Sequence, residues 1–193
     1  LTVLLSGVSL FFGPAAGADA LAAYQPTPYV QVKHPEWSKN AVIYQINTRQ
    51  FTAEGTFAAA QQQLPRLKAL GVDILWLMPI QPIGELNRKG QLGSPYSIKD
   101  YYAVNPEFGN LDDIKAFITA AHQQGMYVIL DWVANHTSWD HPWISAHPEW
   151  YSQNANGQII IPPGTNWNDV ADLNFNQAAM RAAQIDAMKY WVL

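Results

Sequence analysis

The chain has 193 residues, of which 49% are hydrophobic and 13% charged, and its formal net charge is −4. This composition supports one domain of ordinary size with a buried core and excludes an intrinsically disordered chain. The negative charge and a sequence pI near 5.6 argue against nucleic-acid binding, which requires a basic face. Eight Trp and nine Tyr favour sugar rings as partners, because aromatic faces stack on them.

The first 20 residues are typical of a secretory signal peptide. The apolar run Leu1–Phe12 is too short to span a membrane, and the Ala-Asp-Ala of residues 18–20 supplies a cleavage site. The alternative is a buried N-terminal helix. We expect a secreted or periplasmic protein that starts near Leu21 and has no stable membrane anchor. The chain has no Cys, so export would bring no disulfides.

Strands and helices alternate in the first half of the chain. Residues 41–46 are a short run of apolar, β-branched and aromatic residues, which predicts a strand. Three leucines between 64 and 70 recur at helical spacing, and this helix ends at Gly71. Residues 72–80 follow at once and are apolar on both faces, as in a buried parallel strand.

A second helix and a third strand follow a polar segment. Asn110 can cap this helix, which ends at Gly125, and residues 126–131 form the strand. A last helix starts near Gln177. Its expected apolar stripe is Ala179, Ala182, Ile185, Met188 and Trp191.

The order βαβαβ predicts an α/β fold, and the connections locate its site. Residues 79–109 and 132–173 are long segments that leave the carboxyl ends of two strands, the edge where barrels and open sheets bind ligands. The pattern alone leaves a barrel and an open sheet as alternatives. No Gly-rich phosphate loop follows the first strand, which disfavours a nucleotide-binding sheet. Three strands cannot close a barrel, so we expect exposed apolar strand edges and poor solubility for this chain alone.

Two groups of residues on these segments could carry chemistry. The first is Asp131, Asn135 and His136, where the third strand enters its long segment. A carboxylate at the end of an apolar strand needs partners or a role. The alternatives are a structural carboxylate that accepts hydrogen bonds from loop amides, and a histidine that only packs.

The second group lies on the other long segment and comprises Tyr96, Asp100 and Tyr102. Pro95 can hold the Tyr96 ring upright, and Asp100 can orient a neighbour or a sugar hydroxyl. The alternative is a loop in which the tyrosines simply pack.

A transition-metal site is not predicted. The residues His136, Asp140, His141 and His147 are near one another in the sequence, but their spacing matches no helical or zinc pattern.

Together these residues resemble the α-amylase family of glycoside hydrolases (family 13). Asp131, Val133, Asn135 and His136 match each fixed position of that family's first conserved region, Asp-x-Val-x-Asn-His. Further matches occur in order over about residues 41–193. They are Tyr44-Gln-Ile with Arg49-x-Phe51, Leu70-Gly-Val72 with Ile74 and Trp76, Tyr96 with Asp100 and Tyr102, Asn105-Pro-Glu-Phe-Gly109, His122-x-x-Gly125 and Ala171-Asp-Leu-Asn174.

The resemblance implies a (β/α)8 TIM barrel of which only the first three βα units are present. Residues 21–193 would be part of the catalytic domain, and residues 137–170 would be a small version of the family's domain B. The implied activity is hydrolysis or transglycosylation at α-1,4-glucosidic bonds of starch or maltodextrins, by a retaining mechanism with two carboxylates. The implied partner is an α-glucan or oligosaccharide.

The resemblance also assigns roles to residues. Tyr96 would stack on the sugar in the −1 subsite, and His136 would bond its hydroxyls. Asn135 and Asp172 would bind Ca²⁺, which prefers oxygen ligands. The residues that would orient their neighbours are Asp131, Asp100 and Tyr102. The tryptophans that could line one wall of the cleft are Trp143, Trp150 and Trp167.

One part of the family pattern is missing from this sequence. In the family the nucleophile follows Gly-Phe-Arg-x, and no Gly-Phe-Arg occurs here. We therefore expect the 193-residue chain alone to be inactive, with nucleophile and acid supplied by sequence beyond Leu193. The alternative is a non-catalytic sugar-binding or scaffold protein on an amylase-like barrel.

Overall fold

The computed structural model describes residues 33–192. The described residues divide between Lys39 and Asn40 into two units, and the 3-10 helix η1 (Glu36–Asn40) covers that boundary. All other elements belong to the second unit, which is described below. The predicted signal peptide lies outside the described residues. Within residues 33–192, no helix combines the length and apolar character needed to cross a membrane.

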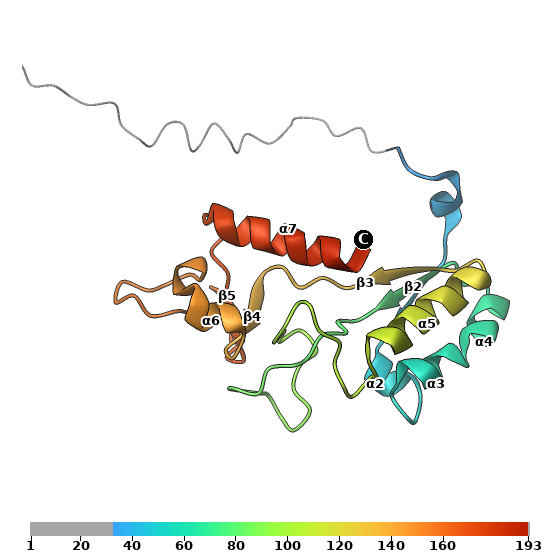
Figure 1. Cartoon of the computed structure of the whole chain (residues 1–193), viewed down its shortest axis with the longest axis horizontal. Helices are drawn as coiled ribbons and strands as arrows, with labels where there is room; N and C mark the ends of the chain where they lie inside the picture. Colours follow the sequence, from blue (N-terminus) through green and yellow to red (C-terminus); the bar gives the residue numbers. More distant parts are fainter. Residues whose placement is uncertain (1–32, 193) are drawn as a thin grey trace, which may run out of the picture. The chain divides into compact units, whose positions relative to one another are not determined.

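Three parallel strands form the centre of the second unit. They are β1 (Ile43–Ile46), β2 (Ile74–Leu77) and β3 (Tyr127–Leu130), in the order β1-β2-β3. Ile43 pairs with Ile74, which pairs in turn with Tyr127, so the first residues of the three strands are in register. This confirms the three predicted strands, and Figure 1 shows them side by side. Strand β1 begins later than predicted, and β2 and β3 are shorter at both ends.

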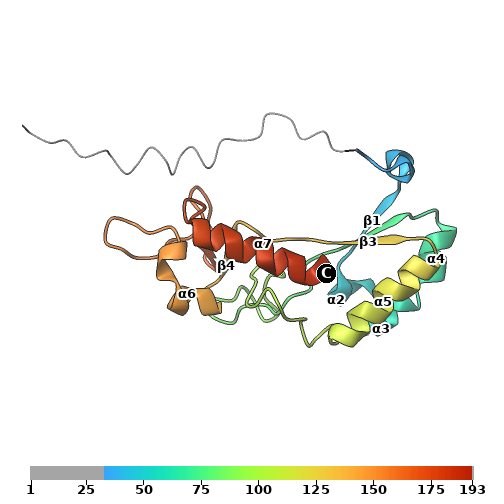
Figure 2. The ribbon, with the colours of Figure 1, turned by 45° about the horizontal axis from the view of Figure 1, so that its top comes forward.

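Helices from the connections pack on one face of this sheet (Figures 1 and 2). They are α2 (Thr48–Phe51), α3 (Phe57–Gln61), α4 (Leu64–Ala69) and α5 (Leu111–Gln123). Their apolar side chains meet those of the strands in a core that includes Leu64, Leu67, Leu75, Ile114 and Phe117. The expected helix with leucines at 64, 67 and 70 differs at its end, because Leu70 is the cap after α4 and is 65% exposed.

Local sequence explains where α5 begins and where two helices end. The Asn110 side chain accepts hydrogen bonds from the backbone N–H groups of Asp112 and Asp113, and the Asp113 carboxylate accepts one from the Asn110 backbone N–H, which completes a capping box. After α4 and α5 the chain turns through Gly71 (φ 90°) and Gly125 (φ 69°). Other residues rarely adopt these values, so glycine makes such short returns possible.

The opposite face of the sheet exposes apolar side chains. Ile43 of β1 is 55% exposed, and Tyr127 and Ile129 of β3 are 44% and 43% exposed. The neighbouring residues Val128 and Leu130 pack against the helical core. The apolar residues of these strands therefore lie on both faces, of which one packs on helices and the other is exposed.

The segment after β3 folds as an insert with its own small core. It contains β4 (His136–Ser138), α6 (Pro142–Ala146), η2 (Pro148–Trp150) and β5 (Val170–Asp172). The strands β4 and β5 pair antiparallel, so the two ends of the insert lie together. The core of the insert includes Trp150, Tyr151, Ala171 and Leu173.

The last helix, α7 (Ala178–Val192), forms where it was expected but buries a different face. Met180, Gln184 and Ala187 are buried, whereas Ile185 is 52% and Met188 47% exposed. The predicted stripe was therefore wrong. Ile185 and Met188 instead line an apolar hollow of about 630 Å³ together with residues of α5 and β3.

Candidate functional site

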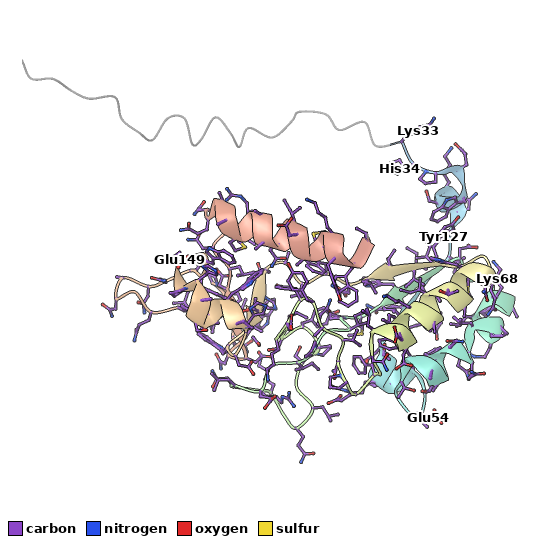
Figure 3. All side chains as sticks on the ribbon, in the orientation of Figure 1. Lys33, His34, Glu54, Lys68, Tyr127 and Glu149 are labelled. Atoms are coloured by element: carbon purple, nitrogen blue, oxygen red, sulfur yellow. The ribbon has the colours of Figure 1, made fainter. Side chains whose placement is uncertain are left out.

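The two long segments meet beyond the carboxyl ends of the strands. Residues 78–110 connect β2 to α5, and residues 131–177 connect β3 to α7. In Figure 3 Lys68 and Tyr127 mark the opposite end of the sheet, far from the insert that carries Glu149. The segments enclose a hollow of about 440 Å³, which we call the first hollow. Its lining comes from both: Tyr96, Asp131, Trp132, Val133, Ala134, Asn135, His136, Pro162, Pro163, Thr165, Trp167 and Asp172.

Tyr96 and Asp131 make the contact that joins the two predicted groups. The backbone N–H of Asp131 still donates to the Leu77 carbonyl at 2.9 Å, so this carboxylate extends directly from the end of the β2–β3 ladder. The Tyr96 hydroxyl donates to its Oδ2 at 3.0 Å. Burial and this bond raise the pKa of Tyr96, so the hydroxyl stays protonated. Asp131 thereby fixes the ring of Tyr96 at the first hollow.

His136 is buried at the start of β4, with 7% of its surface exposed. Its Nδ1 lies 3.1 Å from Asn135 Nδ2 and its Nε2 lies 3.2 Å from the Tyr96 carbonyl oxygen. An amide N–H on one side and a carbonyl on the other fit a neutral ring protonated at Nε2. Burial lowers the pKa of His136, which agrees with the neutral form. Both ring nitrogens are engaged, so a sugar hydroxyl would share one of them.

Asn135 and Asp172 lie on the same side of the first hollow. The backbone N–H of Leu173 donates to the Asn135 carbonyl at 3.1 Å, which holds the ends of the insert together. Among residues 33–192, the side-chain oxygen of Asn135 and the carboxylate of Asp172 have no hydrogen-bond donor. Two free oxygens of this kind are ligands that a hard cation accepts, so these residues fit the Ca²⁺ that the resemblance implies.

The structure does not bring Asp100 and Tyr102 to the first hollow. Asp100 Oδ1 accepts the backbone N–H of Tyr102 at 2.8 Å, and Asp100 lines a separate hollow of about 520 Å³. Tyr102 is 44% exposed and its ring meets that of Tyr190 in α7 at 5.3 Å. The turn that Asp100 closes directs Tyr102 toward α7, and the role of the two residues in orienting active-site neighbours stays a prediction.

Tyr101, which was not among the predicted site residues, packs behind Trp132 and Val133 in the wall of the first hollow. It is 1% exposed, its hydroxyl donates to the Val133 carbonyl at 2.8 Å, and its ring stacks on Trp132 at 5.0 Å. The Trp132 indole N–H in turn donates to Gln184 of α7 at 3.0 Å. The Tyr-Tyr pair was the available signal, because the two side chains point in different directions from this turn, with Tyr101 buried and Tyr102 against Tyr190.

Only one of the three tryptophans expected on the cleft wall lies there. Trp167 lines the first hollow and is 44% exposed. Trp143 and Trp150 instead pack edge to face in the core of the insert, with ring centroids 5.1 Å apart. Trp150 is buried and Trp143 is partly buried, and both stabilise the insert and lie outside the lining of the first hollow.

The histidines of the insert do not form a metal cluster. Among residues 33–192, no group of three or more His, Cys, Asp and Glu side chains could hold a metal ion. His141 is buried, and its Nδ1 accepts the backbone N–H of Trp143 at 3.1 Å, which caps α6. The binding of a cation by Asn135 and Asp172 stays a prediction.

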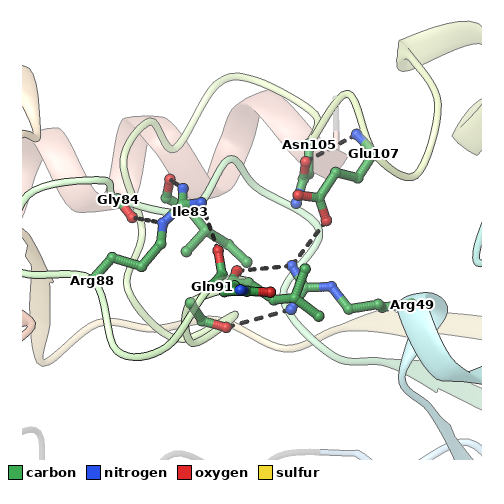
Figure 4. A network of polar contacts seen from close by, with 9 residues as sticks. Arg49, Ile83, Gly84, Arg88, Gln91, Asn105 and Glu107 are labelled. Carbon is green, nitrogen blue, oxygen red and sulfur yellow. Dashed lines mark hydrogen bonds and ion pairs between the residues drawn. The ribbon is translucent and has the colours of Figure 1, made fainter.

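Two arginines hold the segment that carries Tyr96 (Figure 4). Arg49, from α2, donates to the carbonyls of Leu92 at 3.1 Å and Gly93 at 3.4 Å, and pairs with Glu107 at 2.9 Å. Because Gly93 and Tyr96 are only three residues apart, these bonds tie the approach to Tyr96 to the first βα unit.

Arg88 closes the same segment on itself (Figure 4). It donates to the carbonyls of Gly84 at 2.7 Å, Ile83 at 2.9 Å and Gln91 at 3.5 Å. The segment lacks a helix or a long ladder, so guanidinium–carbonyl bonds supply part of its order. The periodicity of the sequence does not reveal such hydrogen bonds between a side chain and the backbone.

The sequence and the fold are similar to those of known proteins. Residues 36–159 match the family profile of the α-amylase catalytic domain. Over 187 residues the chain is 34% identical to the α-1,4-glucan:maltose-1-phosphate maltosyltransferase of Rhodospirillum rubrum, covering 85% of this chain and 27% of that protein. A trehalose synthase of Pimelobacter sp. is 29% identical over 83% of this chain and 33% of its own length.

Solved structures agree. An α-amylase from Lactobacillus plantarum superimposes with a TM-score of 0.76 at 49% identity, over 79% of this chain and 36% of that chain. A maltogenic α-amylase from Thermotoga neapolitana gives 0.74 at 38% identity, over 80% and 36%. The present chain thus spans about a third of the length of these relatives. It belongs to the α-amylase catalytic-domain family of glycoside hydrolases, and its three βα units are part of that family's (β/α)8 barrel.

Proposed function

We propose that this chain supplies one wall of the active site of an enzyme that hydrolyses or transfers at α-1,4-glucosidic bonds of starch or maltodextrins. The observation that carries the proposal is the 3.0 Å contact of Tyr96 with Asp131, which holds an aromatic ring at the edge of the sheet beside His136. The named relatives, which act as amylases, a maltosyltransferase and a trehalose synthase, support the same class of reaction.

The residues of this chain would bind and orient the substrate. Tyr96 would stack on the glucosyl residue whose bond is cleaved, and Asp131 would keep its ring in place. The neutral His136 would hydrogen-bond a hydroxyl of the same sugar while it holds the Tyr96 backbone. Because Asp131 is engaged by Tyr96, we assign it to orientation. The nucleophile and the acid of a retaining mechanism are other carboxylates.

Calcium would be bound in part by Asn135 and Asp172 and would connect the end of β3 to the end of the insert. The chemistry the ion supplies is structural: it neutralises the carboxylate and fixes the loop. The test is a melting experiment on the protein expressed from its complete gene, with and without a chelator. We expect a lower Tm with chelator for the natural protein and no chelator effect for Asp172→Asn. An unchanged Tm in the natural protein would remove the calcium site.

Export is proposed from residues 1–20 alone. The test is N-terminal sequencing of the protein from culture medium or periplasm. A start near Leu21 supports the proposal, and a retained Leu1 contradicts it.

The activity is tested with the protein expressed from its complete gene. We expect release of shorter maltooligosaccharides from starch or maltotetraose, with retained anomeric configuration in the first products. Tyr96→Ala should lower kcat/KM by about 100-fold or more, since a stacked ring and its positioned hydroxyl are both lost. Tyr102→Ala is the matched control, because Tyr102 lies outside the first hollow, and should change kcat/KM by less than about threefold. Binding of maltotetraose without any turnover would favour a non-catalytic sugar-binding protein.

A further inference from the structure

The insert carries a hairpin that projects from the rest of its fold (Figures 1 and 2). Its two sides are joined by the bridge between Gln153 and Ile159 and by the hydrogen bond from the Asn154 backbone N–H to the Gln158 carbonyl at 2.9 Å. The turn at the tip contains the one Asn-Gly pair of the 193-residue sequence, at residues 156–157. In such a pair the side-chain amide can reach the next backbone nitrogen, because glycine has no side chain in the way.

Asn156 has a free side chain at an exposed position. All residues from 153 to 158 are exposed, and none of them belongs to the core of the insert. Among residues 33–192 the Asn156 side-chain amide has no hydrogen-bond partner, whereas the Asn154 amide donates to Gln158 Oε1 at 3.0 Å. The Asn156 side chain can therefore turn toward its own backbone, and water from the solvent can reach it.

Gly157 presents the nitrogen that such a reaction needs. Its φ of 75° is a conformation that glycine adopts without strain. A Cβ placed at this residue would meet only Gln153 Oε1, at 3.9 Å, so the space around the nitrogen is open. One bond restrains the nitrogen, because its N–H donates to the Asn154 carbonyl at 2.9 Å. This bond must open before the nitrogen can react.

Asn154 holds the turn closed. Its Oδ1 accepts the backbone N–H groups of Asn156 at 2.9 Å and of Gln158 at 3.0 Å, in addition to the bond that its carbonyl accepts from Gly157. All of these bonds belong to an exposed tip without core contacts, so they can open locally while the insert stays folded. The Asn154 side chain therefore slows a reaction at Asn156 without preventing it.

We propose that Asn156 is a site of spontaneous deamidation, with water as the only co-reactant and with its rate controlled by Asn154. The Gly157 nitrogen loses its proton and bonds to Asn156 Cγ, the bond from Cγ to Nδ2 breaks, and Nδ2 leaves as ammonia with that proton. The step is intramolecular and closes a five-membered succinimide ring, so it needs no catalyst to bring the two groups together.

Hydrolysis of the ring gives two products. One water molecule adds in either case, and nothing is oxidised or reduced. Cleavage between the Gly157 nitrogen and Cγ gives aspartate. Cleavage between that nitrogen and the carbonyl carbon of residue 156 gives isoaspartate, whose backbone runs through Cβ and Cγ. Both products replace a neutral amide by a carboxylate, so each event adds one negative charge to the tip of the hairpin.

This modification site is separate from the candidate functional site. Neither Asn156 nor Gly157 belongs to the lining of the first hollow, and the reaction uses no ligand of that hollow. The inference is therefore independent of the proposed function, and neither depends on the outcome of the other's test.

The test incubates the protein expressed from its complete gene in mildly alkaline buffer and follows its peptides by mass spectrometry. An isoaspartyl methyltransferase assay detects the isoaspartate product. We expect Asn156 to convert before any other asparagine of residues 33–192. Asn156→Gln should stop conversion at this position, because the longer side chain would have to close a six-membered ring. Asn154→Ala removes both hydrogen bonds to Oδ1 and should accelerate conversion by about fivefold or more.

Two variants isolate the contribution of Asn154. Gln158→Ala is the matched control, because it removes the bond between the two side chains and keeps both backbone bonds to Asn154 Oδ1. It should change the rate by less than about twofold. Asn154→Asp keeps an oxygen acceptor and should not accelerate conversion.

Three outcomes would overturn the inference. Earlier conversion at another asparagine, or no conversion at Asn156 over a period in which the urea-unfolded protein converts there, would remove the site. Equal rates in Asn154→Ala and Gln158→Ala would remove the role of Asn154.

Discussion

Replacing Arg49 with Gln should loosen the segment that presents Tyr96. The variant loses the hydrogen bonds to the Leu92 and Gly93 carbonyls and the ion pair with Glu107. A hydrogen bond to a charged group contributes about 1.5–3 kcal/mol, but the one to Gly93 is long at 3.4 Å. The ion pair adds at most about 1 kcal/mol, because 48% of the Glu107 side chain is exposed.

An unpaired nitrogen of Arg49 reduces the stabilisation that the variant would lose. The Nε of Arg49 is buried without a hydrogen-bond partner, and its desolvation costs about 1–3 kcal/mol that Gln would not incur. We therefore expect the free energy that holds the segment closed to fall by about 2 kcal/mol. That value corresponds to a roughly 30-fold larger open population.

Hydrogen exchange followed by mass spectrometry measures this opening directly. Faster exchange should be confined to residues 88–96, with the strands unchanged. Glu107→Gln is the matched control, because it breaks the ion pair and keeps both carbonyl bonds, and it should accelerate exchange by less than about fivefold. If Arg49→Gln and Glu107→Gln behave alike, the carbonyl bonds do not hold the segment and the reasoning fails.

Three further predictions concern stability in denaturant unfolding. Gly84→Ala should cost about 1–3 kcal/mol, because the new Cβ would lie 2.2 Å from the Ser138 Cβ, and adding Ser138→Gly should restore most of it; no rescue would exclude this clash as the cause. Asn110→Ala should cost about 1 kcal/mol and Asn110→Ser much less, since only serine keeps a cap; equal losses would contradict the capping argument. Burial lowers the pKa of His141 to about 4, so between pH 6.5 and 4 the unfolded state binds more protons and stability falls by about 3 kcal/mol as pH falls. His141→Asn, which keeps an acceptor for the Trp143 N–H, should lack this part of the slope, and an identical slope would refute it.

Local signals in the sequence were sufficient for the framework of the fold. Gly71 and Gly125 mark helix ends because positive φ is a property of the backbone itself. Asn110 marks a helix start because its cap partners lie two and three residues away. Each of these signals acts within a few residues, so it can be detected without tertiary information.

Contacts between distant segments determined what the sequence could not predict. In α7 the apolar periodicity favoured the face with Ile185, but Gln184 is buried because it accepts the indole N–H of Trp132, 52 residues earlier. In the Tyr-Tyr pair, Tyr101 and not Tyr102 is buried because the Val133 carbonyl accepts its hydroxyl bond. A polar partner far along the chain reversed the expected side in both cases.

Contacts between distant segments also hold the site residues in place. Tyr96 and His136 come from segments that have little regular structure of their own, yet each has two fixed contacts. One contact of each residue joins the two long segments: the Tyr96 hydroxyl donates to Asp131, and His136 Nε2 lies beside the Tyr96 carbonyl. A substitution in either segment should therefore alter the ligand-binding surface on both sides of the first hollow.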